Sequence, residues 1–104
     1  MIDNLIVKSK TPYTREHILN AMQDNYHILN EDGLAIFNIV QDEMHILFLY
    51  VIGDKGHIWA KALEQLAKET NCTSMKFITR RDKAFARAYP DFKPVAVMFE
   101  KRLD

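Results

Sequence analysis

Cysteine is almost absent from this chain: among 104 residues only Cys72 carries a thiol. A single cysteine cannot close an internal disulfide, and no cysteine and histidine residues stand at the spacing of a zinc site. The N-terminus also lacks the charged-then-apolar pattern of a secretory leader. These absences together predict a cytoplasmic protein that needs no metal.

Long apolar runs and an excess of charge are missing as well. The longest apolar stretch, Met44–Ile52, falls well short of the ~20 residues that a membrane helix needs. Fourteen basic residues balance fourteen acidic ones, so no net field draws the chain toward nucleic acid or a membrane surface. We therefore expect neither of these as a partner.

What the sequence does contain is enough apolar residues, 48% of the total, to form one core. The aromatic fraction of 11% is likewise typical of a folded globular protein rather than of a disordered tail. No repeat, low-complexity tract or linker divides the chain, so we expect a single domain over residues 1–104.

The N-terminal third predicts one strand and one helix. Residues Ile2–Val7 form a short apolar run that we interpret as a strand. Thr11-Pro12 or Thr14 then begins a helix, since proline suits the first helical turn and threonine suits the cap. This helix is expected to continue to a turn at residues 30–33, because apolar residues recur at helical spacing: Ile18, Leu19, Met22, Tyr26 and Leu29.

The remainder predicts a mixed sheet. Leu34–Gln41 and Met44–Ile52 are rich in β-branched and aromatic residues, and Asp42-Glu43 between them is short enough for a hairpin. Because Met44–Ile52 is apolar on both faces, we expect it at the centre of a sheet that helices cover. The order of elements indicates an α/β (α+β) fold. The elements expected next are a helix over Lys55–Thr70 with Ile58, Trp59, Ala62, Leu63, Leu66 and Ala67 on its apolar face, a strand over Ser74–Thr79, a helix over Asp82–Tyr89 and a strand over Pro94–Lys101.

A glycine loop joins the central strand to the long helix. Gly53-Asp54-Lys55-Gly56 follows the strand directly. A helix N-terminus offers amide groups without intrahelical partners, together with the positive end of the helix dipole. This arrangement favours an anion such as a phosphate at the loop.

From Leu34 to Leu103 the order of elements and several residues resemble the GCN5-related N-acetyltransferase (GNAT) superfamily. Residues 55–60, Lys-Gly-His-Ile-Trp-Ala, are similar to its diphosphate-binding loop, Arg/Gln-x-x-Gly-x-Gly/Ala. The resemblance implies acetyl-CoA as the cofactor, with its pantetheine arm along a splayed strand and a backbone amide near Val51 polarising the thioester. Ile58 stands where the family has glycine, and its branched side chain is expected to crowd the diphosphate. The loop residues that would hold the cofactor are Gly53, Lys55, Gly56, His57, Ile58 and Ala60.

The C-terminal part is similar to the closing helix and strand of the same family. Arg81 takes the place of its asparagine, and Tyr89 stands one residue after its tyrosine. The resemblance implies Tyr89 as the acid that protonates the departing thiolate. Glu43 is the candidate base for the amine proton, and His45 is a second candidate. The N-terminal part is shortened, with room for about one helix where the family has two.

Three functions remain open on the sequence alone. The first is a small N-acetyltransferase that modifies an amine of a small molecule or a protein. The second is a GNAT-like fold that has lost catalysis and acts as an interaction or accessory protein, as small phage-encoded members of the architecture would. The third is an unrelated α/β module without a cofactor. An exposed edge such as Leu34–Gln41 would also permit a homo-oligomer.

Overall fold

The computed structural model describes residues 1–11, 13–77, 87 and 101. In chain order, the elements of this part are α1 (Ile2–Ser9), α2 (Arg15–Asp24), β1 (Tyr26–Asn30), β2 (Gly33–Val40), β3 (Glu43–Val51), α3 (Gly56–Glu69) and β4 (Ser74–Phe77). The sheet order is β1-β2-β3-β4; β1, β2 and β3 are antiparallel, and β4 runs parallel to β3. The described residues therefore form a small α+β fold with an open, mixed sheet, which confirms the prediction at that level.

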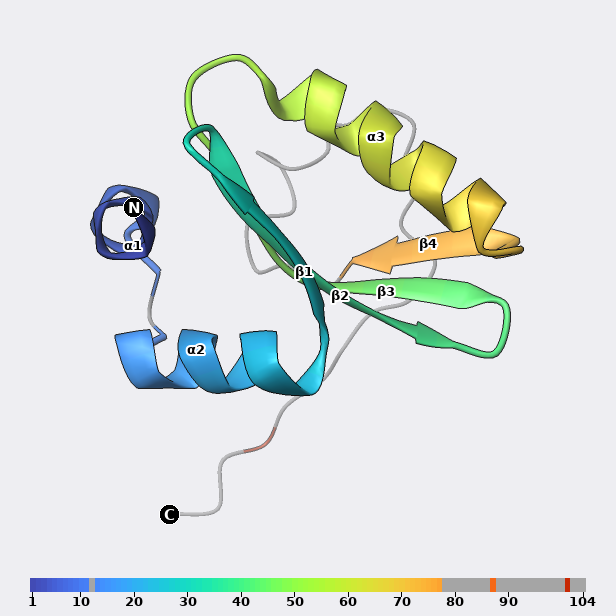
Figure 1. Ribbon diagram of the computed structural model, residues 1–104, viewed down its shortest axis with the longest axis horizontal. Coiled ribbons are helices and arrows are strands. Elements are labelled where there is room, and N and C mark those ends of the chain that lie inside the picture. The colour runs from blue at the N-terminus through green and yellow to red at the C-terminus, as the bar shows by residue number, and fades with distance from the viewer. Residues whose placement is uncertain (12, 78–86, 88–100, 102–104) are drawn as a thin grey trace.

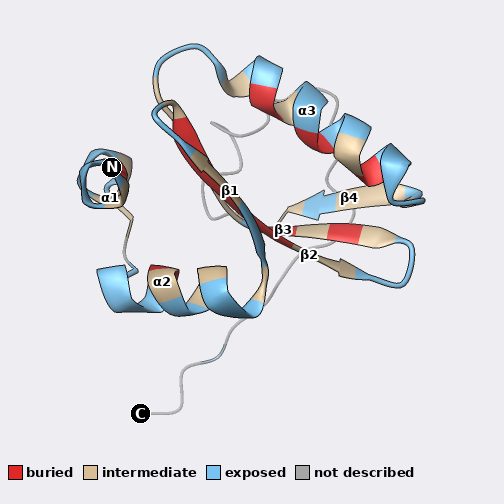
Figure 2. Cartoon of the chain, viewed as in Figure 1, coloured by how far each residue is buried: buried red, intermediate tan, exposed pale blue. Residues whose placement is uncertain are grey.

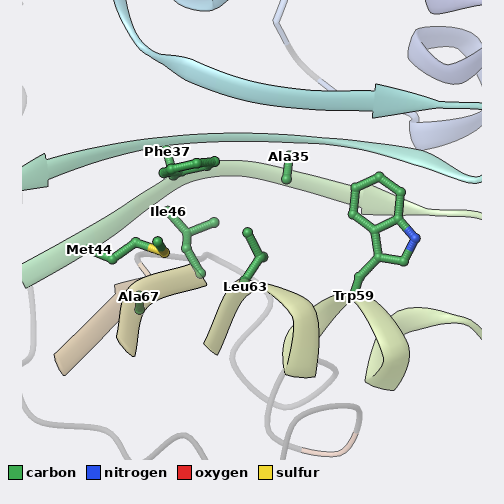
Figure 3. Close-up of a cluster of buried hydrophobic side chains, with 7 residues drawn as sticks. All are labelled: Ala35, Phe37, Met44, Ile46, Trp59, Leu63 and Ala67. Atoms are coloured by element: carbon green, nitrogen blue, oxygen red, sulfur yellow. The ribbon is translucent and has the colours of Figure 1, made fainter. Parts of the chain in front are cut away.

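Each face of the sheet has its own apolar core. Figure 1 shows α3 on one side of the sheet and α1 with α2 on the other. On the second face, Leu5 of α1 and Ile18 of α2 pack with Leu34 and Ile36 of β2. Figure 2 shows that the buried residues of α3 lie on the side that faces the sheet. The cluster under α3, drawn in Figure 3, consists of Ala35, Phe37, Met44, Ile46, Trp59, Leu63 and Ala67.

The central position predicted for Met44–Ile52 is confirmed. The strand β3 pairs with β2 on one side and with β4 on the other, and its residues contribute to both cores. The neighbouring strand Leu34–Gln41, expected to offer an exposed edge, instead pairs with both β1 and β3. Any oligomer formed through a sheet edge would therefore have to use a strand other than β2.

The strand predicted over Ile2–Val7 is wrong, because these residues form α1. Leu5 is 3% exposed, whereas Val7 is 76% exposed. Two residues in a strand share a face when they are two positions apart, so this contrast is incompatible with a half-buried strand and is natural in a helix.

The helix predicted to run as far as Leu29 ends at Asp24. Its start is as expected, since Oγ1 of Thr14 accepts a hydrogen bond from the His17 amide at 3.1 Å. Beyond Asn25, Tyr26–Asn30 pair with β2 along their whole length. Two helices thus precede the first strand, where the sequence suggested one.

Two tight hairpins flank β2. The second turns at Gln41-Asp42, one residue earlier than predicted, and Gln41 adopts a φ of 57°. At the other end of β2, Gly33 allows a close approach between strands, because a Cβ there would lie 2.3 Å from the carbonyl oxygen of Tyr50. The hairpins bring residues 30–33 beside the end of β3.

Helix α3 occupies the predicted segment, but the face that it packs against the sheet is narrower than the predicted apolar face. Its buried residues Trp59, Leu63 and Ala67 are spaced by four, whereas Ile58 is 56% exposed and Ala62 is exposed. The prediction that Ile58 and Ala62 belong to the core face is therefore wrong. The predicted strand at Ser74 is confirmed through Phe77. Residues 78–79, the helix expected over Asp82–Tyr89 and the strand expected over Pro94–Lys101 lie outside the described residues, apart from Arg87 and Lys101.

Candidate functional site

The start of α3 presents amide groups that have no partner among the described residues. The carbonyl of Lys55 accepts hydrogen bonds from the amides of Ile58 at 3.1 Å and Trp59 at 3.2 Å. Within the described part of the chain, the amides of Gly56 and His57 donate to no acceptor, and no side chain caps the helix. The first turn holds no acidic residue. These features leave the positive end of the helix dipole available to an anion.

The turn before the helix is open to solvent. Gly53 has a φ of 69°, the left-handed region that favours glycine, and no atom lies within 4 Å of where a Cβ would be. Apart from its chain neighbours Ile52 and the exposed Asp54, nothing described therefore covers the backbone at Gly53.

Both basic side chains of the loop already have partners. The Lys55 ammonium lies 3.0 Å from Oδ1 of Asp32, in the β1–β2 turn, and both side chains are about half exposed. Nδ1 of His57 lies 3.0 Å from the carbonyl oxygen of Asp54. The loop is also held to the hairpin by the Ile52 amide, which donates to the Asp32 carbonyl at 2.7 Å. The contacts therefore hold the loop in place and leave the amides of Gly56 and His57, rather than its basic side chains, without partners among the described residues.

Ile58 is one of the residues that line a hollow between α3 and the β1–β2 hairpin. This hollow has a volume of about 260 Å³ and is lined by Ile28, Asn30, Asp32, Ile58, Trp59, Ala62 and Leu63. Ala60, the last of the predicted loop residues, is half-buried in the first turns of α3. The structure thus brings six of the predicted cofactor residues together: Gly53, Lys55, Gly56, His57, Ile58 and Ala60.

Val51 ends β3 just before this loop, where it pairs with Gly33. Glu43 lies at the opposite end of the same strand, eight residues away, a separation of roughly 26 Å. The structure therefore does not bring Glu43 near the glycine loop. Tyr89 lies outside the described residues.

Glu43 belongs to a polar group formed between β3 and β4. Its carboxylate forms an ion pair with Lys76 and lies 3.7 Å from Nε2 of His45. The hydrogen bond from Lys76, supported by the charges of Lys76 and His45, holds the pKa of Glu43 below its ordinary value of 4.5. Glu43 is therefore a weaker base than an ordinary carboxylate.

Among the described residues, His45 has a buried side-chain nitrogen that makes no hydrogen bond. Nε2 is shielded from solvent and has no hydrogen-bond partner among the described residues, because Glu43 lies beyond hydrogen-bond distance. A buried nitrogen without a partner can accept or donate a proton when a ligand or a water molecule arrives.

Sequence reasoning missed an irregularity in the middle of β3. Ile36 faces Phe48 but its neighbour Phe37 faces Ile46, so Leu47 has no counterpart in β2 and forms a β-bulge. A bulge breaks the hydrogen-bond ladder and is often found beside functional sites. An uninterrupted apolar run hides such a feature, since it has no alternation that an extra residue could disturb.

A second hollow lies beside the bulge, on the face of the sheet opposite α3. Its volume is about 390 Å³, and Leu47, one of its lining residues, is 49% exposed. The other lining residues come from the segment before α2, from α2 itself and from the two central strands: Tyr13, His17, Ile18, Ala21, Ile36 and Phe48.

Other kinds of site find no support in the described residues. No group of three or more histidine, cysteine, aspartate and glutamate side chains there could hold a metal ion. Among the helices of this part, none is both long and apolar enough to cross a membrane. Comparisons with protein-family models, with curated proteins and with solved structures find no match for the chain.

Proposed function

We propose that this protein is a small GNAT-type N-acetyltransferase, which transfers an acetyl group from acetyl-CoA to an amine. The observation that carries the proposal is the start of α3, which follows the central strand after the turn at residues 52–55. There the amides of Gly56 and His57 have no acceptor among the described residues. Backbone amides at a helix N-terminus are a common binding element for diphosphates.

The arrangement of the elements supports this proposal. An antiparallel hairpin leads through a glycine turn into α3, which then crosses to the parallel strand β4. Two helices precede the first strand, as many as the family has in its N-terminal part, although no strand precedes them among the described residues.

The loop fits the diphosphate of acetyl-CoA through its backbone. Gly53 leaves room for the group, and the amides of Gly56 and His57 can donate to it. Lys55 acts mainly by holding the loop against Asp32. When bound, acetyl-CoA supplies the acetyl group as a reactive thioester.

The bulge at Leu47 is the element best suited to polarise the thioester carbonyl. A backbone amide aimed at a developing oxyanion stabilises the transition state, and a bulge frees such a group from the ladder. Leu47 lies four residues before Val51, or roughly 13 Å along the strand. The pantetheine arm would therefore extend along β3 from the loop to the bulge.

The amine proton requires a base close to this point. His45 lies two residues from Leu47, and its shielded Nε2 makes no hydrogen bond in the described part of the chain, although the Glu43 carboxylate lies 3.7 Å away. Glu43 is held ionised by Lys76 and serves to orient and charge-stabilise His45. Tyr89 remains the predicted acid for the thiolate.

Thermal melting with acetyl-CoA tests the proposal. A ligand at 100 times its dissociation constant stabilises the folded state by about 2.7 kcal/mol. Acetyl-CoA should therefore raise the melting temperature, and S-acetylpantetheine, which lacks the diphosphate, should raise it far less. The absence of any shift at millimolar acetyl-CoA would refute the proposed function.

A charge added at His57 tests the position of the loop. In His57→Glu the new carboxylate lies in the first turn of α3, where it should stabilise the free protein by about 0.3–1 kcal/mol. The same charge should weaken acetyl-CoA binding about tenfold, since two like charges repel by about 1 kcal/mol or more at contact. His57→Gln is the neutral control and should bind like the wild type. Equal affinities in all three proteins would place the cofactor elsewhere.

A non-catalytic interaction protein is the alternative, and the two ion pairs favour it. Lys55–Asp32 and Lys76–Glu43 engage the charges that catalysis and phosphate binding would otherwise use. Acetyl-CoA binding without transfer to any amine would support this alternative.

A further inference from the structure

The hollow beside the bulge has the size of a site for one small molecule. Its volume of about 390 Å³ lies at the lower end of ligand pockets, which span roughly 300–1,000 Å³. Ile18 and Ile36, which are 2% and 0% exposed, contribute buried apolar surface to it, and the half-buried Ala21 and Phe48 add to this surface. The exposed side chains Tyr13, His17 and Leu47 complete the lining.

The polarity of the lining limits what could bind. Only Tyr13 and His17 bring polar side chains, and no carboxylate lines the hollow among the described residues. A polyamine or a lysine-rich peptide would bring several ammonium groups into this lining, and each one taken out of water requires a partner, whereas a monoamine brings one such group and can keep it at the solvent-exposed rim. The apolar surface instead suits a flat, apolar body, which the rings of Phe48 and Tyr13 can contact by stacking.

We propose that this hollow binds the acceptor, a primary amine carried on an aromatic group. The aromatic end lies against Ile18, Ile36 and Phe48, and the amino group lies at the bulge. This inference rests on the proposed acetyl transfer for its chemistry, but the binding site itself does not depend on it.

The transfer balances without any further reactant. The neutral amine nitrogen forms a bond to the acetyl carbon while the carbon–sulfur bond breaks. One proton leaves the nitrogen and one proton joins the sulfur of the departing thiolate, so no electrons are gained or lost.

Binding of 2-phenylethylamine to the full chain, measured by ligand-observed NMR without acetyl-CoA, tests the site. Ala21→Phe should fill the hollow and weaken binding at least tenfold. Gln23→Phe is the control, since it places the same ring on an exposed position of the same helix. The two variants should melt at similar temperatures. Absence of binding by the wild type, or equal binding by both folded variants, would overturn the inference.

A second variant tests specificity and does not depend on filling the hollow. Leu47 is half exposed, so Leu47→Glu should fold and should place a carboxylate in the lining. If acetyl-CoA is a substrate, the wild type should acetylate 2-phenylethylamine with a higher kcat/KM than spermidine. Leu47→Glu should lower the ratio of kcat/KM for 2-phenylethylamine to kcat/KM for spermidine at least tenfold. A wild type that prefers spermidine would overturn the inference while leaving acetyl transfer intact. A third outcome would separate the two hypotheses: the protein does not bind acetyl-CoA, but it binds 2-phenylethylamine, and of the two phenylalanine variants only Ala21→Phe abolishes this binding. That outcome would reject the proposed acetyltransferase activity and support the amine-binding site.

Discussion

Deletion of Leu47 should leave the fold intact, because the ladder between β2 and β3 does not need this residue. Ile46 packs in the core under α3, and Phe48 packs in the core under α1 and α2. Without Leu47 these two residues would be adjacent, and a regular strand places adjacent side chains on opposite faces. Ile46 and Phe48 would also lie opposite the adjacent residues Phe37 and Ile36, as they do now.

The loss of unfolding free energy on deletion of Leu47 follows from how much of its side chain is buried. Burying a leucine side chain fully is worth about 1.5–3 kcal/mol, and Leu47 stays 49% exposed. Its removal should therefore cost at most about 1.5 kcal/mol. Hydrogen bonds regained in the regular ladder offset this cost at about 1 kcal/mol each. We expect the free energy of unfolding to change by less than about 1 kcal/mol, or a Tm shift of at most about 8 °C.

Urea unfolding followed by the fluorescence of Trp59, the single tryptophan, measures the change. Deletion of Ile36 is the contrasting variant, because it would join Ala35 to Phe37, which both pack under α3. One half of β2 would then have to turn its side chains to the wrong face, and this variant should fail to fold. A loss of more than about 3 kcal/mol on deletion of Leu47 would refute the bulge argument. A folded deletion variant that binds acetyl-CoA but does not transfer the acetyl group would support the catalytic role of the bulge.

Two glycines and one lysine give further predictions. Gly33→Ala should destabilise the protein by about 3 kcal/mol, because its Cβ would meet β3 backbone that cannot move independently. Gly53→Ala should cost only about 1 kcal/mol, from its positive φ alone, and urea unfolding distinguishes the two. Glu43 has a lowered pKa, so its stabilising contribution is present above pH 4.5 and is lost as the pH falls through the lower, folded-state value. Below pH 4.5 the unfolding free energy should therefore fall less steeply with pH in Lys76→Met than in the wild type. Lys61→Met is the control, because Lys61 has no ion pair among the described residues, and its unfolding free energy should fall as steeply as that of the wild type. Equal pH slopes in the two variants would contradict the assignment.

The elements that could be predicted are those with a strong local signal. Thr14 has the side chain of a helix cap, and the run from Met44 to Ile52 is too apolar to lie anywhere but between two covered faces. The long helix was predictable because Trp59 and Leu63 recur at helical spacing beside a glycine turn. Since these signals lie within a few residues of one another, the glycine loop of the candidate site was also predictable.

The elements that could not be predicted depend on distant partners. Tyr26 and Leu29 have helical spacing with Ile18 and Met22, but a ladder with β2 holds them in a strand. Ile58 has the hydrophobicity of a core residue, yet the fully buried residues of α3 form a single row spaced by four, with only Leu66 packing beside it in part. The bulge is set by a mismatch in register between two strands, which no single segment of sequence records.

The positions of the candidate groups along β3 decide which of them could act together. In the proposed reaction, a cofactor anchored at the start of α3 would follow β3 as far as Leu47 to approach the hollow, so we propose the polarising amide at the bulge rather than near Val51. Proton transfer requires contact at about 2.6–3.2 Å or through one water molecule. Glu43 lies four residues from Leu47, or roughly 13 Å along the strand, whereas His45 lies at about half that distance. Within such a site, Glu43 is therefore a positioning residue for His45. Its replacement by glutamine should shift the pH profile of kcat while leaving acetyl-CoA binding unchanged, and His45→Gln should abolish transfer. Full activity of His45→Gln at neutral pH would reject this assignment.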